Sequence, residues 1–435
     1  MFKYLYMSIL NCKQFIFQKY QLKKSKNQIR FYYCLDNKIK FTEIITLNQK
    51  PNWKKIDAKL LDKILFNLHL MLGISYWKTY CPKKIIIKSG VLSKKQAQFW
   101  NKLYANGLGE FYYKNKIDFR GLVNFPYKQD IRCPKTAQPQ FAAANWGWAV
   151  FGHRMSNSTL VPLGGGRDSI VTAELLKEKN INFNLFSLRE SAVQKNVAKI
   201  INKKYFIVNR IIDKKLLNKS NKYYQGHIPI TAVYSFTALL IAVLHNYKNI
   251  IFSNEKSANF GNVKYLGKII NHQYSKSAEF EKDFQNYIHQ FITPGIDYFS
   301  LLRSLSELQI TELFSKHKKY FYKFSSCNLN FKMSGEKKTM WCCKCPKCAF
   351  VFCQLSAFIS KKELLKIFGK NLYADKSLLN LYLELLGKKN IKPFDCVGTP
   401  EEVKTAMHLA LQKNEFREDF ILKYFKKNVL SKLKK

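Results

Sequence analysis

The sequence predicts a mixed α/β protein built around a parallel sheet. Between residue 160 and about residue 262, apolar strand-like runs alternate with helical patterns, an order that is typical of parallel sheets with helices on both faces. A run of three glycines joins the first strand-like run to the first helical pattern. Five of the eleven cysteines lie between residues 342 and 353, and the chain beyond residue 350 has helical patterns throughout. These observations predict a parallel α/β core followed by a cysteine-rich, helical C-terminal region.

We expect three regions in the chain. Residues 1–145 read as an α+β domain with strand-like alternation over 31–47, a helix over 56–73 that ends at Gly73, and a second helix capped by Ser93. A turn-rich segment, 133–139, is the predicted linker. Residues 146–320 form the α/β domain, and residues 321–435 the cysteine-rich helical region.

The predicted core has four strands. They cover residues 161–163, 182–188, 205–211 and 249–254, with helices predicted up to Asn180, over 191–204 and over 230–247. A further helix is expected from Ala278 to Phe291. In such sheets, ligands bind beyond the carboxyl ends of the strands, which is where the glycine turn lies.

The glycine turn is a candidate phosphate site. It comprises Gly164, Gly165, Gly166, Arg167, Asp168 and Ser169. Glycines allow close approach of the backbone to a phosphate, and the free N–H groups of the first helical turn point toward it. The turn lacks the Gly-Lys-Ser/Thr ending of a Walker A loop. It resembles the SGGxDS motif of ATP pyrophosphatases, with Gly164 in place of the usual serine. The alternative is a turn that merely joins a strand to a helix.

A second polar loop follows the fourth predicted strand. Its sequence, SNEKSANFGN over 253–262, contains Asn254, Asn259, Asn262 and one carboxylate, Glu255. It should lie at the same edge of the sheet as the glycine turn, although loops rich in Asx turns are also common without a function. His272 and Lys276 follow shortly after it. A lone histidine is more often a satisfied structural residue than a catalytic base.

The cysteine cluster predicts a metal site. Cys342, Cys345 and Cys348 have C-x2-C-x2-C spacing, and Cys327 supplies a fourth thiolate. Four thiolates suit a structural Zn²⁺ ion, and an iron–sulfur cluster is also compatible with them. Cys343 could replace Cys342 if the register shifts. The alternative is a set of buried thiols or a redox pair.

The net charge of +45 does not by itself indicate a nucleic-acid partner. Only nine of the 74 basic residues are arginines, and the lysines are spread along the whole chain. The N-terminus lacks the unbroken apolar core of a signal peptide, and no apolar run is long enough to span a membrane. We expect a cytoplasmic protein with reduced cysteines, no membrane span and no nucleic-acid partner. The oligomeric state is not predicted.

With these motifs in hand, the chain resembles the ATP-dependent UDP-N-acetylmuramoyl-L-alanyl-L-glutamate epimerases of bacterial peptidoglycan synthesis. The resemblance covers most of the chain. It rests on the order of strings such as LGISYWKTYCP (72–82), LVPLGGGRDS (160–169), GHIPITAVYSF (226–236), NHQYSKSAEFE (271–281), WCCKCPKCAFVF (341–352) and KPFDCVGTPEE (392–402). Phe260 departs from the family's pattern, where glutamate is expected, so no catalytic role is carried to that position.

The resemblance implies that ATP activates the terminal L-glutamate as an acyl-adenylate, releasing diphosphate, and that inversion gives D-glutamate and AMP. Adenylation neutralises the carboxylate and so makes the α-proton easier to remove. The glycine turn would hold diphosphate, and Asp168 would hold Mg²⁺ or orient the helix turn. Glu255, His272 and Lys276 are the candidates for acid and base. The N-terminal domain would then contact the UDP-sugar of the substrate.

Three other functions remain open at this point. 7-Cyano-7-deazaguanine synthases combine a similar ATP motif with a C-x2-C-x2-C zinc site, but they generally lack an N-terminal domain of this kind. A tRNA-modifying ligase or thiolase should carry an RNA-binding module and clustered arginines, and neither is evident in the sequence. A zinc-binding interaction protein that has lost its ATP site is the third alternative.

Overall fold

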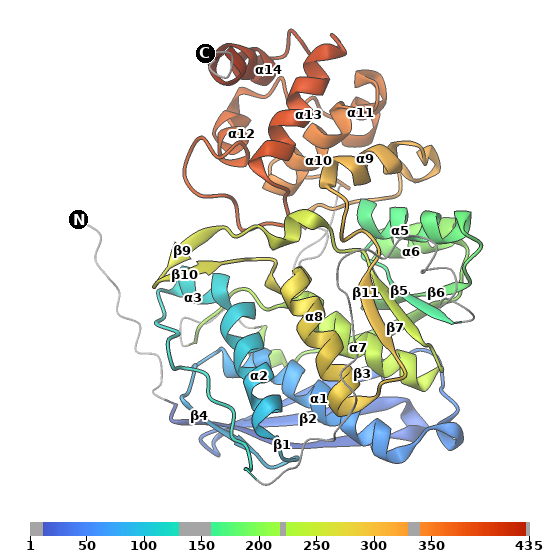
Figure 1. Cartoon of the computed structure of the whole chain (residues 1–435), viewed down its shortest axis with the longest axis vertical. Helices are drawn as coiled ribbons and strands as arrows, with labels where there is room; N and C mark the ends of the chain where they lie inside the picture. Colours follow the sequence, from blue (N-terminus) through green and yellow to red (C-terminus); the bar gives the residue numbers. More distant parts are fainter. Residues whose placement is uncertain (1–11, 130–157, 218–222, 329–339, 432–435) are drawn as a thin grey trace.

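A computed structural model of the chain describes residues 12–129, 158–217, 223–328 and 340–431 (Figure 1). The predicted linker, 133–139, and the predicted boundary at residue 145 lie outside these ranges. The division into regions 1–145, 146–320 and 321–435 therefore stays a prediction.

Within the described residues, one nine-stranded sheet runs through the molecule. Its strands are β1 (Gln14–Lys23), β2 (Gln28–Leu35), β3 (Ile39–Leu47), β4 (Lys84–Ile87), β5 (Thr159–Pro162), β6 (Phe183–Leu188), β7 (Tyr205–Ile211), β8 (Asn249–Phe252) and β11 (Asp297–Ser300). The spatial order is β11-β8-β5-β6-β7-β3-β2-β1-β4. Strands β11, β8, β5, β6 and β7 pair in parallel; the alternating pattern predicted all of them except β11. Strand β3 pairs antiparallel with β7, so the N-terminal strands extend the same sheet.

Strands β5 and β8, at the centre of the parallel part of the sheet, are buried on both faces. In β5, Leu160 packs into one hydrophobic core and its neighbour Val161 packs into the other. Ile250 and Ile251 of β8 divide in the same way. Because successive side chains of a strand point to opposite faces, this division shows that helices cover both sides of the sheet.

The helices of the first core are mostly N-terminal. They are α1 (Ala58–Trp77), α2 (Lys94–Gly107), α3 (Gly109–Asn115), α7 (Ile230–Leu244) and α8 (Ala278–Tyr287). The expected helix ending at Gly73 is wrong: α1 continues through Gly73 to Trp77. A Cβ atom at Gly73 would lie 2.3 Å from Cε1 of Phe17, so this glycine permits close packing on β1 instead of ending the helix. Ser93 caps α2 with a full capping box, as predicted.

The second core joins the opposite face of the sheet to the C-terminal helices. It includes α5 (Arg167–Glu178), α6 (Ala192–Ile201), α9 (Glu307–Ser315) and α10 (Pro346–Ser356), followed by α11 (Lys361–Phe368), α12 (Leu379–Leu385), α13 (Pro400–Gln412) and α14 (Phe420–Phe425). Figure 1 shows the helices from α10 to α14 gathered at one end of the molecule, beside α5 and α9. The predicted helical C-terminal region is confirmed.

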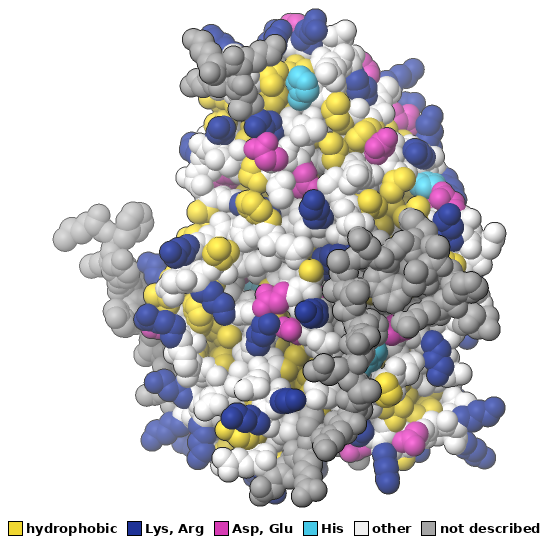
Figure 2. Space-filling model, in the orientation of Figure 1, with side chains coloured by type: hydrophobic (Ala, Val, Ile, Leu, Met, Phe, Trp, Pro, Cys, Tyr) yellow, Lys and Arg dark blue, Asp and Glu magenta, His cyan; other side chains and the backbone are white. Residues whose placement is uncertain are grey.

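Lysines and arginines are scattered over the face of the molecule shown in Figure 2, among hydrophobic and acidic side chains. In the part of the chain that the structure describes, no helix is both long and apolar enough to cross a bilayer.

Candidate active site

The glycine turn has the backbone geometry of a strand-to-helix turn. Gly165 has φ +83°, a conformation that favours glycine, and a Cβ atom there would lie 2.9 Å from Val193. Gly166 is the N-cap of α5, and Gly164 is exposed. Asp168 is half-buried in the first turn of α5, and the Ser169 hydroxyl donates to the Gly166 carbonyl at 3.1 Å. The free N–H groups of the first turn of α5 therefore lie beyond the carboxyl end of β5, just after the three glycines.

Arg167 does not extend into the glycine turn. Its side chain is 1% exposed, and its guanidinium donates to Glu307 of α9 at 2.6 Å and to Thr311 one turn further along. The guanidinium also lies over the ring of Phe350 in α10. This placement argues against the expected role as a phosphate ligand. Arg167 instead anchors the start of α5 to the helices of the C-terminal core.

The loop after β8 brings a buried carboxylate to the same edge of the sheet. Glu255 is 1% exposed, and within the described residues its Oε2 atom has no hydrogen-bond partner. The carboxylate lies close enough to Lys276, Glu307 and Lys392 to affect their pKa values. Burial raises the pKa of Glu307, Asp168 and Glu255 raise it further, and Arg167 opposes the shift.

The three asparagines of this loop bind other parts of the protein. Asn254 donates to Ser300 of β11 at 2.9 Å, and Asn259 accepts from the N–H of Ala278 at 2.8 Å. Asn262 donates to the Pro393 carbonyl at 3.0 Å and accepts from the His272 N–H at 2.9 Å. Asn262 thus holds His272 next to the segment around Pro393. A direct role of these amides in substrate binding stays a prediction.

His272 belongs to a hydrogen-bonded cluster that sequence reasoning did not identify. Its Nδ1 atom bonds to Oε2 of Glu110 in α3, and Nδ1 of His227 lies 3.3 Å from the same oxygen. Burial raises the pKa of Glu110, but the bond to His272 outweighs it and the pKa falls to about 2. Burial opposes protonation of His272, yet Cys396 and Glu110 raise its pKa to about 9. The ring is therefore an imidazolium at neutral pH.

Lys276 is surrounded by groups that carry negative charge. It ends the 3₁₀ turn Tyr274–Lys276, and burial alone would lower its pKa. Cys396, Glu255, Asp168 and Glu307 together raise the pKa above its ordinary value. The predicted phosphate turn, the polar loop and Lys276 are thus brought together, and Lys276 is positively charged there.

Cys396 is a residue of this cluster that the sequence analysis did not single out. It lies in the loop between α12 and α13, partly exposed, with its Sγ atom 3.9 Å from Nε2 of His272. The buried Lys347 side chain donates to its carbonyl. Burial raises the pKa of the thiol, but Lys276 and His272 outweigh burial and lower it to about 6. The only sequence signal was the segment PFDCVG (393–398), which directly precedes Thr399, the N-cap of α13 (Pro400–Gln412).

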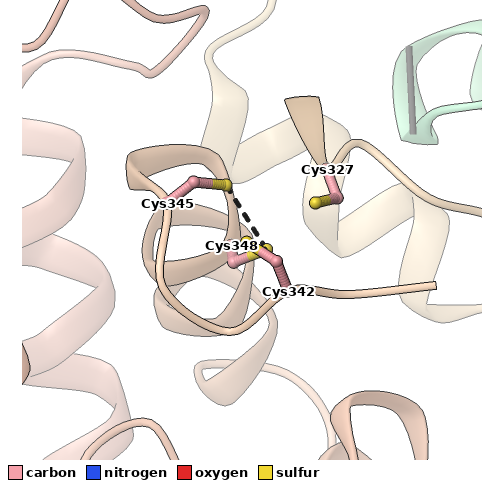
Figure 3. A group of neighbouring side chains, drawn as sticks. All are labelled: Cys327, Cys342, Cys345 and Cys348. Atoms are coloured by element: carbon pink, nitrogen blue, oxygen red, sulfur yellow. Dashed lines mark hydrogen bonds between the residues drawn. The ribbon is translucent and has the colours of Figure 1, made fainter. Parts of the chain in front are cut away.

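The four predicted cysteine ligands converge on one point. The sulfur atoms of Cys327, Cys342, Cys345 and Cys348 lie within 4.8 Å of one another, a set that could hold a metal ion (Figure 3). Cys348 lies 3.7 Å from Cys342 and 3.5 Å from Cys345. The neighbouring Cys343 has φ +56°, and its thiol points to the Phe368 carbonyl. The structure therefore selects Cys342, not Cys343, for the cluster.

Comparisons with known proteins cover nearly the whole chain. Residues 7–301 match the family model of the MurL N-terminal domain, and residues 323–435 match that of the MurL C-terminal domain. The UDP-N-acetyl-alpha-D-muramoyl-L-alanyl-L-glutamate epimerase of Xanthomonas oryzae pv. oryzae is 35% identical over 87% of this chain and 81% of its own. The protein of the same name from a Micromonospora species is 34% identical over 93% of this chain and 88% of its own.

Among solved structures, a U34-tRNA thiolase from Methanococcus maripaludis with a [4Fe-4S] cluster matches 39% of this chain and 58% of its own. The sequence identity is 14% and the TM-score is 0.26. This similarity is too low to support a shared function.

Proposed function

The chain belongs to the MurL epimerase family, and from this premise we propose that it converts the terminal L-glutamate of UDP-N-acetylmuramoyl-L-alanyl-L-glutamate to D-glutamate. The proposed reaction consumes ATP and releases AMP and diphosphate through an acyl-adenylate. It is a step of peptidoglycan synthesis in the cytoplasm. The observation that carries the proposal is the convergence of the glycine turn with a cluster of proton-transfer groups on one edge of the sheet.

The first step is carboxylate activation at the glycine turn. The N–H groups at the start of α5 and the flexible Gly164–Gly166 backbone suit the diphosphate leaving group. Asp168 supplies the oxygen ligand that Mg²⁺ prefers, and Mg²⁺ would neutralise phosphate charge. Ser169 fixes the turn through its bond to Gly166. Arg167 positions the glycine turn indirectly, because its ion pair with Glu307 holds the start of α5 against α9.

The second step is inversion at the α-carbon. Enzymes that invert a carbon need a base on one face and an acid on the other. Glu255, His272 and Lys276 are the charged residues of this cluster that we assign to the proton-transfer step. His272 and Lys276 are protonated at neutral pH and are suited to donate, while Glu255 balances their charge. Water then hydrolyses the adenylate and releases AMP.

The cysteine cluster has a structural role in this proposal. Four thiolates at this spacing fit Zn²⁺, and a site with four protein ligands leaves no open position for substrate. The metal would hold the segment that leads into α10. Lys347, in the first turn of α10, donates to the Cys396 carbonyl.

An assay with the dipeptide substrate, ATP and Mg²⁺ tests the proposal. We expect AMP and diphosphate to form in the reaction. Acid hydrolysis of the product, followed by separation of the glutamate enantiomers, should then yield D-glutamate. Asp168→Ala should abolish AMP formation, whereas Asp297→Ala, at the opposite end of the parallel sheet, should retain it. The epimerase proposal is wrong if the wild-type protein forms neither AMP nor D-glutamate. AMP without D-glutamate would indicate that another acid is adenylated.

A further inference from the structure

We propose that the Cys396 thiolate, held by His272 and Glu110, is the base that removes the α-proton of the activated glutamate. The inference rests on the proposed function, which leaves the proton acceptor unassigned, and it assigns that role to Cys396. It is carried by a chain of contacts from α3 to the loop before α13. Glu110 binds Nδ1 of His272, and Nε2 of the same ring faces Sγ of Cys396 at 3.9 Å.

The contacts from Glu110 through His272 to Cys396 match the arrangement that activates a thiol. A nucleophile or base within reach of a histidine, with the histidine oriented by a third group, is the general arrangement that produces a reactive thiolate. Here Glu110 binds Nδ1 and fixes the orientation of the ring, so the Nε2–H of the imidazolium points to sulfur. Lys114 also donates to Glu110 and holds that carboxylate in place.

Charged groups from several segments lie near Cys396. Lys276, His272 and Lys347 of α10 each lower the pKa of its thiol, and the buried Asp395 carboxyl, next to Cys396 in the sequence, interacts with His272 and Lys347. Glu255, Asp168 and Glu307 raise the pKa of Lys276 and favour its charged ammonium form. Lys392 lies four residues before Cys396 and is itself buried, near Glu255. The positive groups nearest the sulfur favour its ionised form.

Exposure distinguishes Cys396 from Glu255 as the base. A base must reach the proton that it removes. Glu255 is 1% exposed beneath its own loop, whereas Cys396 is partly exposed in a loop between helices. Glu255 therefore acts on the charge of Lys276, and Cys396 is the group that can meet a substrate.

The proposed step balances in protons and electrons. The Cα–H bond breaks, the S–H bond of Cys396 forms, and the electron pair passes into the acyl-adenylate carbonyl. A proton from the Lys276 ammonium then adds to the opposite face of the α-carbon. Solvent removes the proton from Cys396 and restores the one on Lys276. No oxidant or additional reactant is needed.

The test separates adenylation from proton transfer. In D2O, with the dipeptide substrate, ATP and Mg²⁺, the wild-type protein should place one deuterium on Cα of the D-glutamate product. Cys396→Ser and Cys396→Ala should keep AMP formation within about 3-fold and lose deuterium incorporation by about 100-fold or more, the range for loss of a general base. Cys12→Ser, another partly exposed thiol, should behave as wild type. Deuterium incorporation by Cys396→Ser within 3-fold of wild type would overturn the inference.

A second measurement needs neither substrate nor turnover. Iodoacetamide alkylation of Cys396, followed by peptide mass spectrometry on the whole protein, should rise with pH through a midpoint near 6. Glu110→Gln should move this midpoint upward, because it removes the charge that holds His272 protonated. A wild-type midpoint near 8.5, the value of an ordinary thiol, would refute the thiolate. If the wild-type protein instead forms no AMP and no D-glutamate, the proposed function fails, whatever the alkylation shows.

Discussion

The buried pair between Arg167 and Glu307 gives a quantitative prediction. The guanidinium and the carboxylate are each 1% exposed and are joined at 2.6 Å, with Thr311 as a second acceptor. Removing Glu307 leaves the Arg167 guanidinium charged, buried and unpaired, which typically costs about 3–5 kcal/mol, and removing Arg167 leaves the buried Glu307 carboxyl without its partner. We therefore expect Arg167→Met to lower the free energy of unfolding by about 3 kcal/mol or more. Glu307→Met should have a similar effect.

A double-mutant cycle tests this reasoning. Replacing both partners, as Arg167→Met with Glu307→Met, removes both charges and the cost of burying them. The double variant should be more stable than either single variant, with a coupling of about 2–3 kcal/mol measured by urea unfolding. Lys404→Met, in an exposed pair with Glu401, is the control and should change stability by less than about 0.5 kcal/mol. Additive single effects would contradict the pairing described here.

Three further predictions follow from the same structure. Cys345→Ser should lose the bound metal and lower thermal stability, whereas Cys343→Ser should retain the metal in elemental analysis; the cluster assignment is wrong if the two behave alike. Gly73→Ala should cost about 1–3 kcal/mol in urea unfolding, because its Cβ atom would overlap a β1 side chain, and an unchanged midpoint would rule out this packing. Epimerisation should rise with pH as the Cys396 thiol ionises, since its pKa is about 6, and fall as the His272 imidazolium loses its proton near its pKa of about 9. A rate that stays flat between pH 5 and pH 7 would disagree with that assignment.

The fold of the central sheet follows from local patterns. Four parallel strands were predictable because each contains a mostly apolar run next to turn residues, and β5 and β8 are buried on both faces. Strand β11 was missed because it has only four residues, DYFS, two of which are polar. Strand β1 was missed because lysines and glutamines interrupt its apolar positions. The continuation of the sheet through β3 depends on pairing between distant segments, which no local pattern encodes.

The candidate site was predictable only where its functional residues are close together in the sequence. The glycine turn and the cysteine ligands have recognisable spacing, and the structure brings the four cysteines together. Cys396 and Glu110 were not singled out, because neither residue lies in a motif with the spacing of known ligands or nucleophiles. Only tertiary packing places Glu110 against His272, and His272 and Lys276 near Cys396. Arg167 was misread for the same reason, since its partner lies 140 residues away.

The most direct test of the account asks whether ATP activates the carboxylate. The dipeptide substrate is prepared with ¹⁸O in its glutamate carboxylates and is incubated with the protein, ATP and Mg²⁺. An acyl-adenylate that water attacks at the carbonyl carbon leaves one carboxylate oxygen on phosphorus. We predict AMP that carries one ¹⁸O atom, formed together with D-glutamate. AMP without ¹⁸O, alongside D-glutamate, would contradict activation through an acyl-adenylate.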